Sequence, residues 1–371
     1  VRSRRQRQMC IRDRAYLVDS TAAPIAGTAF ISTWIGAELG YIQEGLTILN
    51  LSYSPYQIFL HSLQYAFYPI FTLFFIAILI WSRKDFGPML QARKIETINI
   101  EPTIDSKNNT PYYHALISIF LLLFITFLGL WITGKKDTPQ SLSELIGNAN
   151  AYKSLLWGSG LACFGTILLN LTQKISLDKS IHTLLDGFKT MISAMSILIL
   201  AWMLATIIKD LNLSNVLIEL LKGNISLWYL AGFIFIIAAI MSFATGSSWG
   251  TMAILYVICI PLSWKLSQSN GLNEIESLSI LGHCVASVLA GSIFGDHCSP
   301  ISDTTILSSM ATNCEHLKHV KTQLPYAISV GSISLFTSII VVNWSFHWSI
   351  NYIIGFILLY LIIHFIGKNK A

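Results

Sequence analysis

Long apolar stretches do most to decide what this chain can fold into. A helix needs about 20 apolar residues to cross a bilayer core about 30 Å thick. Charged residues make up only 12% of the chain, about half of their share in soluble domains. The sequence therefore predicts an all-α polytopic membrane protein with the lipid bilayer as its surroundings. The uninterrupted candidate spans are 56–81, 112–133, 152–171, 188–208, 322–342 and 348–366.

The basic character of the chain is confined to its beginning. Residues 1–14 carry six Arg and one Asp, which account for the whole net charge of +5. The rest of the chain is balanced, so nucleic acid is not expected as a partner. The segment 1–14 has neither the apolar centre nor the cleavage site of a signal peptide. It is an atypical basic segment, and whether it belongs to the native protein is left open.

The loops predict an orientation and a division into two halves. Basic residues gather in 82–111 and 172–187, which predicts that both segments lie in the cytoplasm. The longest polar connection, 82–111, separates residues 15–81 from residues 112–371. We expect 15–81 to be the end of the first half of an inverted repeat. The remaining transmembrane bundle, 112–371, is then expected to contain the second half.

Polar, Gly and Pro residues break the apolar pattern at 19–40, 244–251 and 295–303. Non-helical backbone at membrane depth is tolerated only inside protein or beside a wet cavity, so such breaks predict a site. Broken and unbroken regions together predict roughly nine to ten membrane segments. Glu38 is either an ion ligand or an interfacial residue that reaches outward. The residues expected to support the site are Thr245, Gly246, Ser247, Ser248, Thr28, Ser32, Thr33 and Glu38.

A short internal similarity links the first and last of these breaks. Residues 24–33 read PIAGTAFIST and residues 300–309 read PISDTTILSS, with Pro, Ile, Thr and Ser in matching positions. An acidic residue, Asp19 or Asp296, precedes each segment. Secondary transporters are often built from two repeats whose broken helices meet near the bilayer midplane. A repeat here predicts that further N-terminal helices of the first half are missing from this chain.

The segment 295–309, GDHCSPISDTTILSS, carries the residues best suited to bind an ion. Asp296 and Asp303 flank Pro300, and an ionisable residue inside the membrane marks a functional site by default. A carboxylate there can hold a proton or a sodium ion but not both, which is the minimum that cation/proton exchange requires. His297 is expected to be a proton-sensitive neighbour. The expected ion- and proton-binding residues are Asp296, Asp303, Ser299, Ser302, Thr304, Thr305 and His297, with sodium at Asp303 and Asp296.

Two simpler roles remain open for these residues. Asp296 could only cap a half-helix that starts near Pro300, and the hydroxyl groups could only bond to backbone carbonyls. The sequence contains no nucleophile elbow, P-loop or HExxH motif, so we expect neither an enzyme nor a bound cofactor.

The segment 295–309, followed by Gln323-Leu324-Pro325-Tyr326, closely resembles the signature of NhaC-type sodium/proton antiporters. The segments 244–251 (ATGSSWGT), 19–25 (DSTAAPI) and 32–36 (STWIG) are also similar to that family. The resemblance covers about residues 16–326. It implies a multi-pass antiporter of the inner (plasma) membrane in the ion-transporter superfamily, with inverted repeats and broken or re-entrant helices.

The resemblance also implies the partners and a role. Sodium ions and protons are the expected substrates, pH homeostasis is the expected role, and a homodimer is left open. The family has N-terminal helices that this chain lacks, and it includes exchangers of organic anions such as malate and lactate. An organic-anion exchanger is therefore the first alternative function. A non-transporting membrane sensor or a subunit of a larger complex is the second.

Overall fold

The computed structural model describes residues 11–29, 32–96, 113–135, 145, 149–189, 192, 203, 226–344 and 347–369. The chain forms two compact units. One unit contains Val1–Phe30, Tyr41–Ile100 and Ile197–Ala371, and the other contains Ile31–Gly40 and Glu101–Ser196. Almost all of the described residues are helical, which confirms the all-α class.

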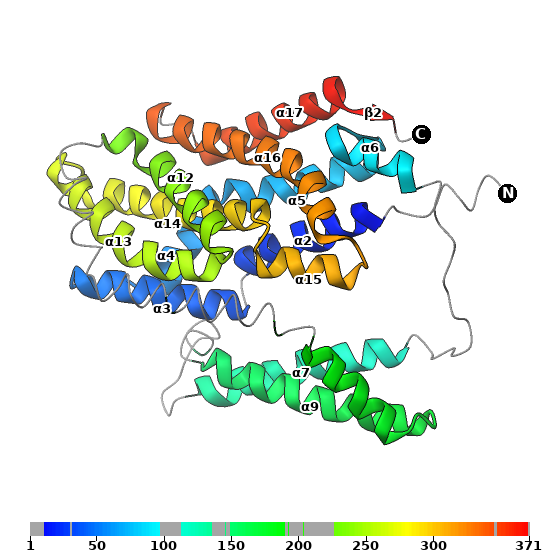
Figure 1. The fold of residues 1–371 in the computed structure, drawn as a ribbon. Coiled ribbons are helices and arrows are strands. Elements are labelled where there is room, and N and C mark those ends of the chain that lie inside the picture. Colours follow the sequence, from blue (N-terminus) through cyan, green and yellow to red (C-terminus); the bar gives the residue numbers. More distant parts are fainter. Residues whose placement is uncertain are drawn as a thin grey trace. The chain divides into compact units, whose positions relative to one another are not determined.

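The first unit is a bundle of helices from both ends of the chain (Figure 1). Its first part contains α2 (Ile11–Thr28), the end of α3 (Thr33–Ile48), α4 (Pro55–Ser62), the 3-10 turn η1 (Leu63–Tyr65), α5 (Phe67–Ser82) and α6 (Gly87–Glu96). Its second part contains α12 (Leu227–Thr245), α13 (Ser248–Ser269), α14 (Glu274–Cys298), α15 (Asp303–Ala311), α16 (His316–Trp344) and α17 (Trp348–Ile366).

Helix α14 is the centre of this bundle. It contacts α12, α13, α16, α4 and α5 as well as α2 and α15. Glycines allow α12 to come close, because a Cβ atom on Gly291 would lie 2.4 Å from the Phe235 carbonyl oxygen. A Cβ atom on Gly295 would lie 2.2 Å from the Ala239 carbonyl oxygen. Small residues on one helix face are the usual means of close packing between membrane helices.

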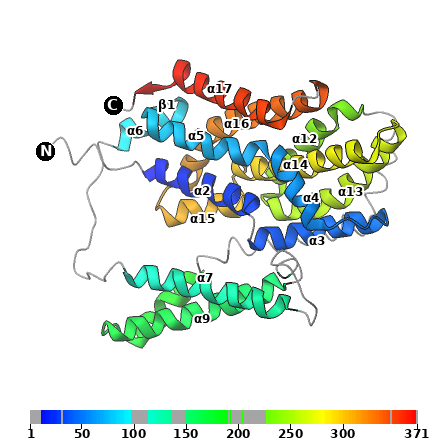
Figure 2. The ribbon, with the colours of Figure 1, turned by 180° about the vertical axis from the view of Figure 1, so that it is seen from behind.

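Two very short strands join distant parts of the same unit. Strand β1 (Lys84–Asp85) follows α5, and β2 (Lys368–Asn369) follows α17. The strands pair antiparallel, with Lys84 opposite Asn369. The view from behind shows α5, α6 and β1 beside the end of α17 (Figure 2). This pairing fixes the end of α5 close to the end of the described chain.

The second unit contains α7 (Tyr113–Gly134), α9 (Ala151–Thr172) and helical residues 177–189. Helices α7 and α9 pack against each other where Gly129 faces Ser154 and Gly158 faces Thr126. Only 11% of the most apolar 18-residue stretch of each helix is buried. Their outer surfaces are apolar side chains such as Leu123 and Phe164, as expected for helices that face lipid.

Six described helices are long and apolar enough to cross a membrane, and the bent helix α4–α5 raises the number to seven. The predicted spans 112–133, 152–171 and 348–366 are confirmed as α7, α9 and α17, and 322–342 lies inside the longer α16. The predicted span 188–208 lies mostly outside the described residues. The nine to ten segments expected from the sequence are not confirmed.

The prediction of one uninterrupted span over 56–81 is wrong. Helix α4 and turn η1 end at Tyr65, and α5 begins at Phe67 after a bend of 48°. Pro69 explains the restart, since a proline has no amide hydrogen and its ring clashes with the carbonyl four residues earlier. That carbonyl belongs to Tyr65, so the proline is compatible only with the first turn of a new helix.

The three expected breaks differ in length from the prediction. Helix α2 continues past Pro24 to Thr28, and α3 begins at Thr33. Helix α12 ends at Thr245 and α13 begins at Ser248, so only Gly246 and Ser247 separate them. Helix α14 continues through 295–298, which confines the last break to 299–302. Pro24 and Pro300 thus have different local structures, and the internal repeat stays a prediction.

Candidate functional site

The junction of α14 and α15 places the two aspartates of the segment 295–309 on opposite sides of a short connection. Asp296 lies in the last turn of α14, and Asp303 opens α15. Ser302 is the N-cap of α15, and its side chain accepts a hydrogen bond from the Thr305 amide at 3.3 Å. Ser302 rather than Asp296 therefore caps this helix. The alternative role of Asp296 as a cap is wrong.

Thr304 connects both carboxylates. Its hydroxyl donates to Asp296 Oδ2 at 2.7 Å, and its backbone amide donates to Asp303 Oδ1 at 2.8 Å. Ser302 Oγ lies 2.9 Å from the same hydroxyl oxygen. Asp296 is completely buried and Asp303 is partly buried. The junction thus gathers two carboxylates and the Ser302 hydroxyl around Thr304.

The break between α12 and α13 packs directly against this junction. Gly246 has a φ of +67°, and a Cβ atom there would lie 2.5 Å from the Ile301 carbonyl oxygen. Only glycine combines this left-handed backbone with such a close approach. Ser299 donates to the Phe243 carbonyl at 2.8 Å, which holds the start of the junction to the end of α12.

The other polar residues of this break have structural bonds. Ser247 caps α13 by accepting from the Gly250 amide at 3.2 Å. Thr245 donates to the Met241 carbonyl at 2.8 Å, and Ser248 is buried. The expectation that hydroxyl groups bond to the backbone thus describes Thr245 and Ser299, while Thr304 bonds to a carboxylate.

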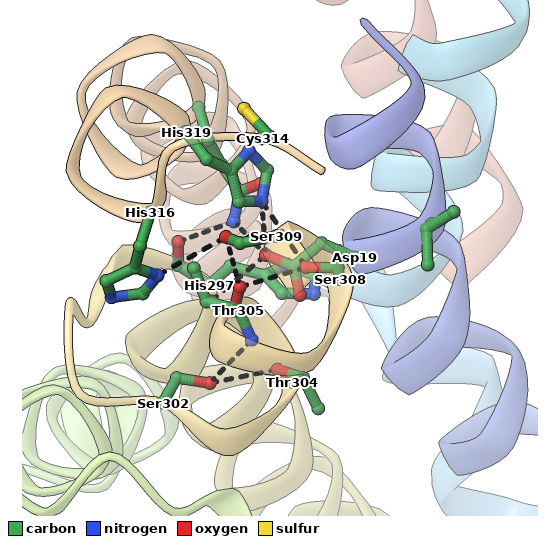
Figure 3. Close-up of polar contacts among 12 residues, drawn as sticks. Asp19, His297, Ser302, Thr304, Thr305, Ser308, Ser309, Cys314, His316 and His319 are labelled. Atoms are coloured by element: carbon green, nitrogen blue, oxygen red, sulfur yellow. Dashed lines mark hydrogen bonds and ion pairs between the residues drawn. The ribbon is translucent and has the colours of Figure 1, made fainter. Parts of the chain in front are cut away.

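A second carboxylate centre lies next to the junction, and the sequence did not assign it. Asp19 of α2 is 1% exposed, and its Oδ2 atom accepts from three side chains (Figure 3). The donors are Thr305 Oγ1 at 3.0 Å, Gln323 Nε2 at 2.6 Å and His319 Nε2 at 3.3 Å. Helices α2, α15 and α16 therefore meet at one oxygen atom. Two sequence signals pointed to Asp19: it precedes the segment similar to 300–309, and it opens the family-like segment 19–25.

His297 connects the two centres through its backbone. Gln323 Nε2 donates to the His297 carbonyl at 2.8 Å as well as to Asp19. The His297 ring turns to α5, where Nδ1 lies 3.0 Å from the Tyr68 hydroxyl. His297 follows Asp296 in the chain, but its ring bonds to the Tyr68 hydroxyl of α5.

The remaining residues expected to support the site have separate local roles. Thr28 donates to the Pro24 carbonyl at 2.6 Å, and Ser32 accepts from the Ile35 amide at 3.1 Å. The Thr33 side chain lies outside the described part. Glu38 is completely buried in α3, so its carboxylate does not reach outward as the interfacial alternative required.

A small cavity of about 40 Å³ lies one helical turn from Asp19 along α2. Tyr16 lines it and packs edge-to-face against Tyr326 with ring centroids 5.1 Å apart. Tyr326 in turn donates to Asp85 Oδ1 at 3.1 Å. The cavity is lined by Asp13, Tyr16, Leu17, Ile76, Leu79, Ile80, Asp85 and Tyr326. Its lining thus includes two further carboxylates.

The site offers oxygen atoms from carboxylate, hydroxyl, amide and backbone groups. Such atoms suit a hard cation, whereas sites for softer metals collect His and Cys. Among the described residues, no group of three or more His, Cys, Asp or Glu could hold a metal ion. The arrangement is that of a buried, oxygen-rich site at the ends of broken helices.

The chain is similar to three known proteins. Over 337 residues it is 31% identical to an uncharacterized protein of Haemophilus influenzae, and this alignment covers 88% of this chain and 63% of that protein. Over 107 residues it is 36% identical to a malate-2H⁺/Na⁺-lactate antiporter of Bacillus subtilis, covering 28% of this chain and 20% of the relative.

Over 103 residues the chain is 34% identical to an arginine/ornithine antiporter of Halobacterium salinarum, covering 27% of this chain and 19% of the relative. The chain therefore spans less than two thirds of each of these three relatives. No solved structure matches the chain.

The sequence model of the Na⁺/H⁺ antiporter family matches residues 27–344. This range includes both broken segments that meet at Gly246 and Ile301, together with Asp296, Asp303 and Gln323. The match covers far more than half of the chain, and it agrees with the resemblance found in the sequence. The chain belongs to the Na⁺/H⁺ antiporter family.

Proposed function

We propose that the protein is a secondary active antiporter that exchanges sodium ions for protons across the inner membrane. The observation that carries this proposal is the junction at Thr304, where two buried or partly buried carboxylates share one threonine. A carboxylate in such a place must be neutralised by a proton or by a bound cation. Competition between these two ligands couples their movements.

The exchange cycle follows from this competition. With the site open to one side, Asp296 and Asp303 release a proton and bind sodium, and the hydroxyl groups of Ser302 and Thr304 contribute oxygen ligands. The bundle then opens to the other side, where protonation expels the ion. Proton entry down its gradient drives sodium out of the cell. This cycle would serve pH homeostasis and sodium removal.

Charge in the protein interior supports a cation as the substrate. Among the described residues, the buried acidic and basic side chains are Asp, Glu and His, with no Lys or Arg. An organic anion would need a positive partner in a medium where unpaired charge is costly. The described interior therefore favours a cation over an anion.

The principal test uses everted membrane vesicles from bacteria that lack their own sodium/proton antiporters and that express the full-length protein. Sodium should dissipate a preformed proton gradient, and Asp303→Asn should abolish the response. Lys189→Gln changes an exposed residue and is the matched control, which should respond like the wild type. Full activity of Asp303→Asn would remove this carboxylate from the mechanism.

An organic-anion exchanger is the second candidate, because one relative exchanges malate and lactate together with protons and sodium ions. In the same vesicles, malate or lactate would then be required before sodium has any effect. An arginine-triggered response would instead point to a substrate like that of the third relative. If the protein is instead a membrane sensor or a subunit of a larger complex, none of these compounds should change the proton gradient of the vesicles.

A further inference from the structure

Buried oxygen atoms without a hydrogen-bond partner gather near the two carboxylate centres. Among the described residues they include Asp19 Oδ1, Asp296 Oδ1 and Gln323 Oε1. All three side chains are at most 1% exposed, and they come from α2, α14 and α16. A buried polar atom without a partner costs about 1–3 kcal/mol. The three residues belong to one hydrogen-bonded network, and their unpartnered oxygen atoms point to a further ligand there.

The hydrogen bonds around Asp19 show why one side of this centre is bare. All three donors, from Thr305, His319 and Gln323, bond to the Oδ2 atom. The other carboxylate oxygen, Oδ1, has no partner. The donors thus leave one carboxylate oxygen for another ligand.

The orientation of the Gln323 amide is fixed by its own bonds. Its Nε2 atom donates to Asp19 Oδ2 at 2.6 Å and to the His297 carbonyl at 2.8 Å. A flipped amide would place an oxygen atom against two other acceptor oxygens, which is unfavourable. The Oε1 atom is therefore an acceptor, and it is buried without a donor. An acceptor beside a carboxylate is a poor site for an anion and a good one for a cation.

We propose that Asp19 and Gln323 form a second cation-binding subsite, which takes a hard monovalent cation of the sodium type. The ligands are Asp19 Oδ1 and Gln323 Oε1, with Thr305 Oγ1 beside them. One carboxylate balances one monovalent charge, and neutral oxygen atoms complete the shell. The subsite is separate from the pair Asp296 and Asp303, and the inference rests on the proposed sodium exchange.

The two subsites are connected through the first turn of α15. Thr304 bonds to Asp296, and the next residue, Thr305, bonds to Asp19. Gln323 adds a second connection, because it bonds to Asp19 and to the carbonyl of His297, the residue after Asp296. The groups that hold one carboxylate are therefore linked to those that hold the other, which couples the two subsites. This arrangement makes two cations per protein the expected load.

The test is direct binding of radioactive sodium to the purified full-length protein, at fixed ionic strength with choline as the replacement ion. The wild type should bind two sodium ions. Gln323→Leu keeps the size of the side chain and removes its oxygen, so it should bind one. Asp296→Asn should also bind one, and the double variant none. Gln268→Leu, at an exposed position of α13, is the matched control and should bind two.

The outcomes separate this inference from the proposed function. A wild type that binds one ion, with no change in Gln323→Leu, overturns the subsite and leaves sodium exchange intact. Two bound ions without sodium/proton exchange in vesicles would refute the proposed function and retain the subsite. If Gln323→Leu does not elute as a folded protein in gel filtration, sodium binding to Asp19→Asn is measured instead, and this variant should bind one ion. A folded Asp19→Asn that still binds two ions overturns the subsite.

Discussion

Thr304 and Thr305 are neighbours in the chain, yet their hydroxyl groups bond to carboxylates from different helices. Thr304 donates to Asp296 of α14, and Thr305 donates to Asp19 of α2. Successive residues of an α-helix point about 100° apart, which follows from 3.6 residues per turn. The first turn of α15 can therefore serve two centres with two adjacent side chains. Each of the two carboxylates thus accepts a hydrogen bond from its own threonine in the first turn of α15.

Replacing Thr304 by valine should weaken sodium binding by about tenfold or more. Valine has nearly the same shape but has no hydroxyl to act as a sodium ligand or to bond to Asp296. Hydrogen bonds to charged groups contribute about 1.5–3 kcal/mol, and each 1.4 kcal/mol changes affinity about tenfold. The measurement is the sodium concentration that gives half-maximal exchange in vesicles.

Thr312→Val is the matched control for this prediction. Thr312 also lies next to α15, but its hydroxyl donates only to the backbone carbonyls of Ser308 and Ser309. Its variant should keep the sodium affinity of the wild type. Equal affinities in both variants would show that the Thr304 hydroxyl contributes nothing to binding.

Single residues also show what a sequence can and cannot reveal about a site. Asp296, Asp303 and Thr304 were predicted because they lie within one short polar segment, and the structure places them together. Asp19 was not assigned a role, because its partners Thr305 and Gln323 are about 300 residues away in the chain. Periodicity and local composition carry no information about such contacts. The ring of His297 bonds to Tyr68 for a similar reason, since a distant helix supplies its partner.

The N-cap of α15 determines where this helix begins, and it can be tested. Ser302→Ala removes the side chain that accepts from the Thr305 amide. Loss of an N-cap typically costs about 1 kcal/mol, and the free energy of unfolding should fall by about that amount. Ser302→Thr retains a capping hydroxyl and should stay close to the wild type. Thermal unfolding in detergent provides the comparison, and equal stability of the alanine variant would refute the role of the cap.

The packing of α12 on α14 depends on glycine. Gly291→Ala places a Cβ atom 2.4 Å from a backbone oxygen of Phe235, so one helix must move. Overpacking of this kind costs about 1–3 kcal/mol. We expect lower stability in thermal unfolding and reduced exchange, because α14 carries Asp296.

Gly160→Ala is the control for the glycine substitution. No atom lies within 4 Å of a Cβ atom added at this position of α9. Alanine also has a higher helix propensity than glycine by about 1 kcal/mol, so this variant should be neutral or slightly more stable. A loss of stability as large as that of Gly291→Ala would mean that close packing is not the cause.

Whole elements were easier to predict than their ends and bends. The span 348–366 agrees with α17 because apolar residues fill a bilayer-length run between a Trp edge and a Gly. The span 56–81 failed, because hydropathy averages over Pro69 and does not register a bend. The polar run 295–298 stays helical because it is buried against α12, where Gly295 allows close contact. The helical state of 295–298 thus depends on tertiary packing, which local sequence patterns do not show.

For the molecule as a whole, the sign of buried charge is the most informative property. The buried acidic and basic side chains in the described parts of both units are carboxylates and three histidines, while the described Lys and Arg residues stay outside the core. The lining of the cavity near Tyr16 repeats this pattern with Asp13 and Asp85. A protein interior with excess negative charge is unstable unless protons or cations enter it. The composition of 12% charged residues does not predict this distribution, since it depends on which charges the fold buries.

Sodium should therefore stabilise the entire folded protein. The proposed ligands lie on α2, α14, α15 and α16, so a bound ion joins helices from both ends of the chain. A ligand that binds only the folded state raises the free energy of unfolding by about 2.7 kcal/mol per site at 100 times its dissociation constant. The midpoint of thermal unfolding in detergent should rise with sodium at constant ionic strength, with choline as the replacement ion. Asp296→Asn should lose a large part of this rise, because the variant lacks one anionic ligand while its amide can still accept from Thr304. An unfolding temperature that is independent of sodium in the wild type would contradict a buried sodium site, since binding and stability are thermodynamically linked.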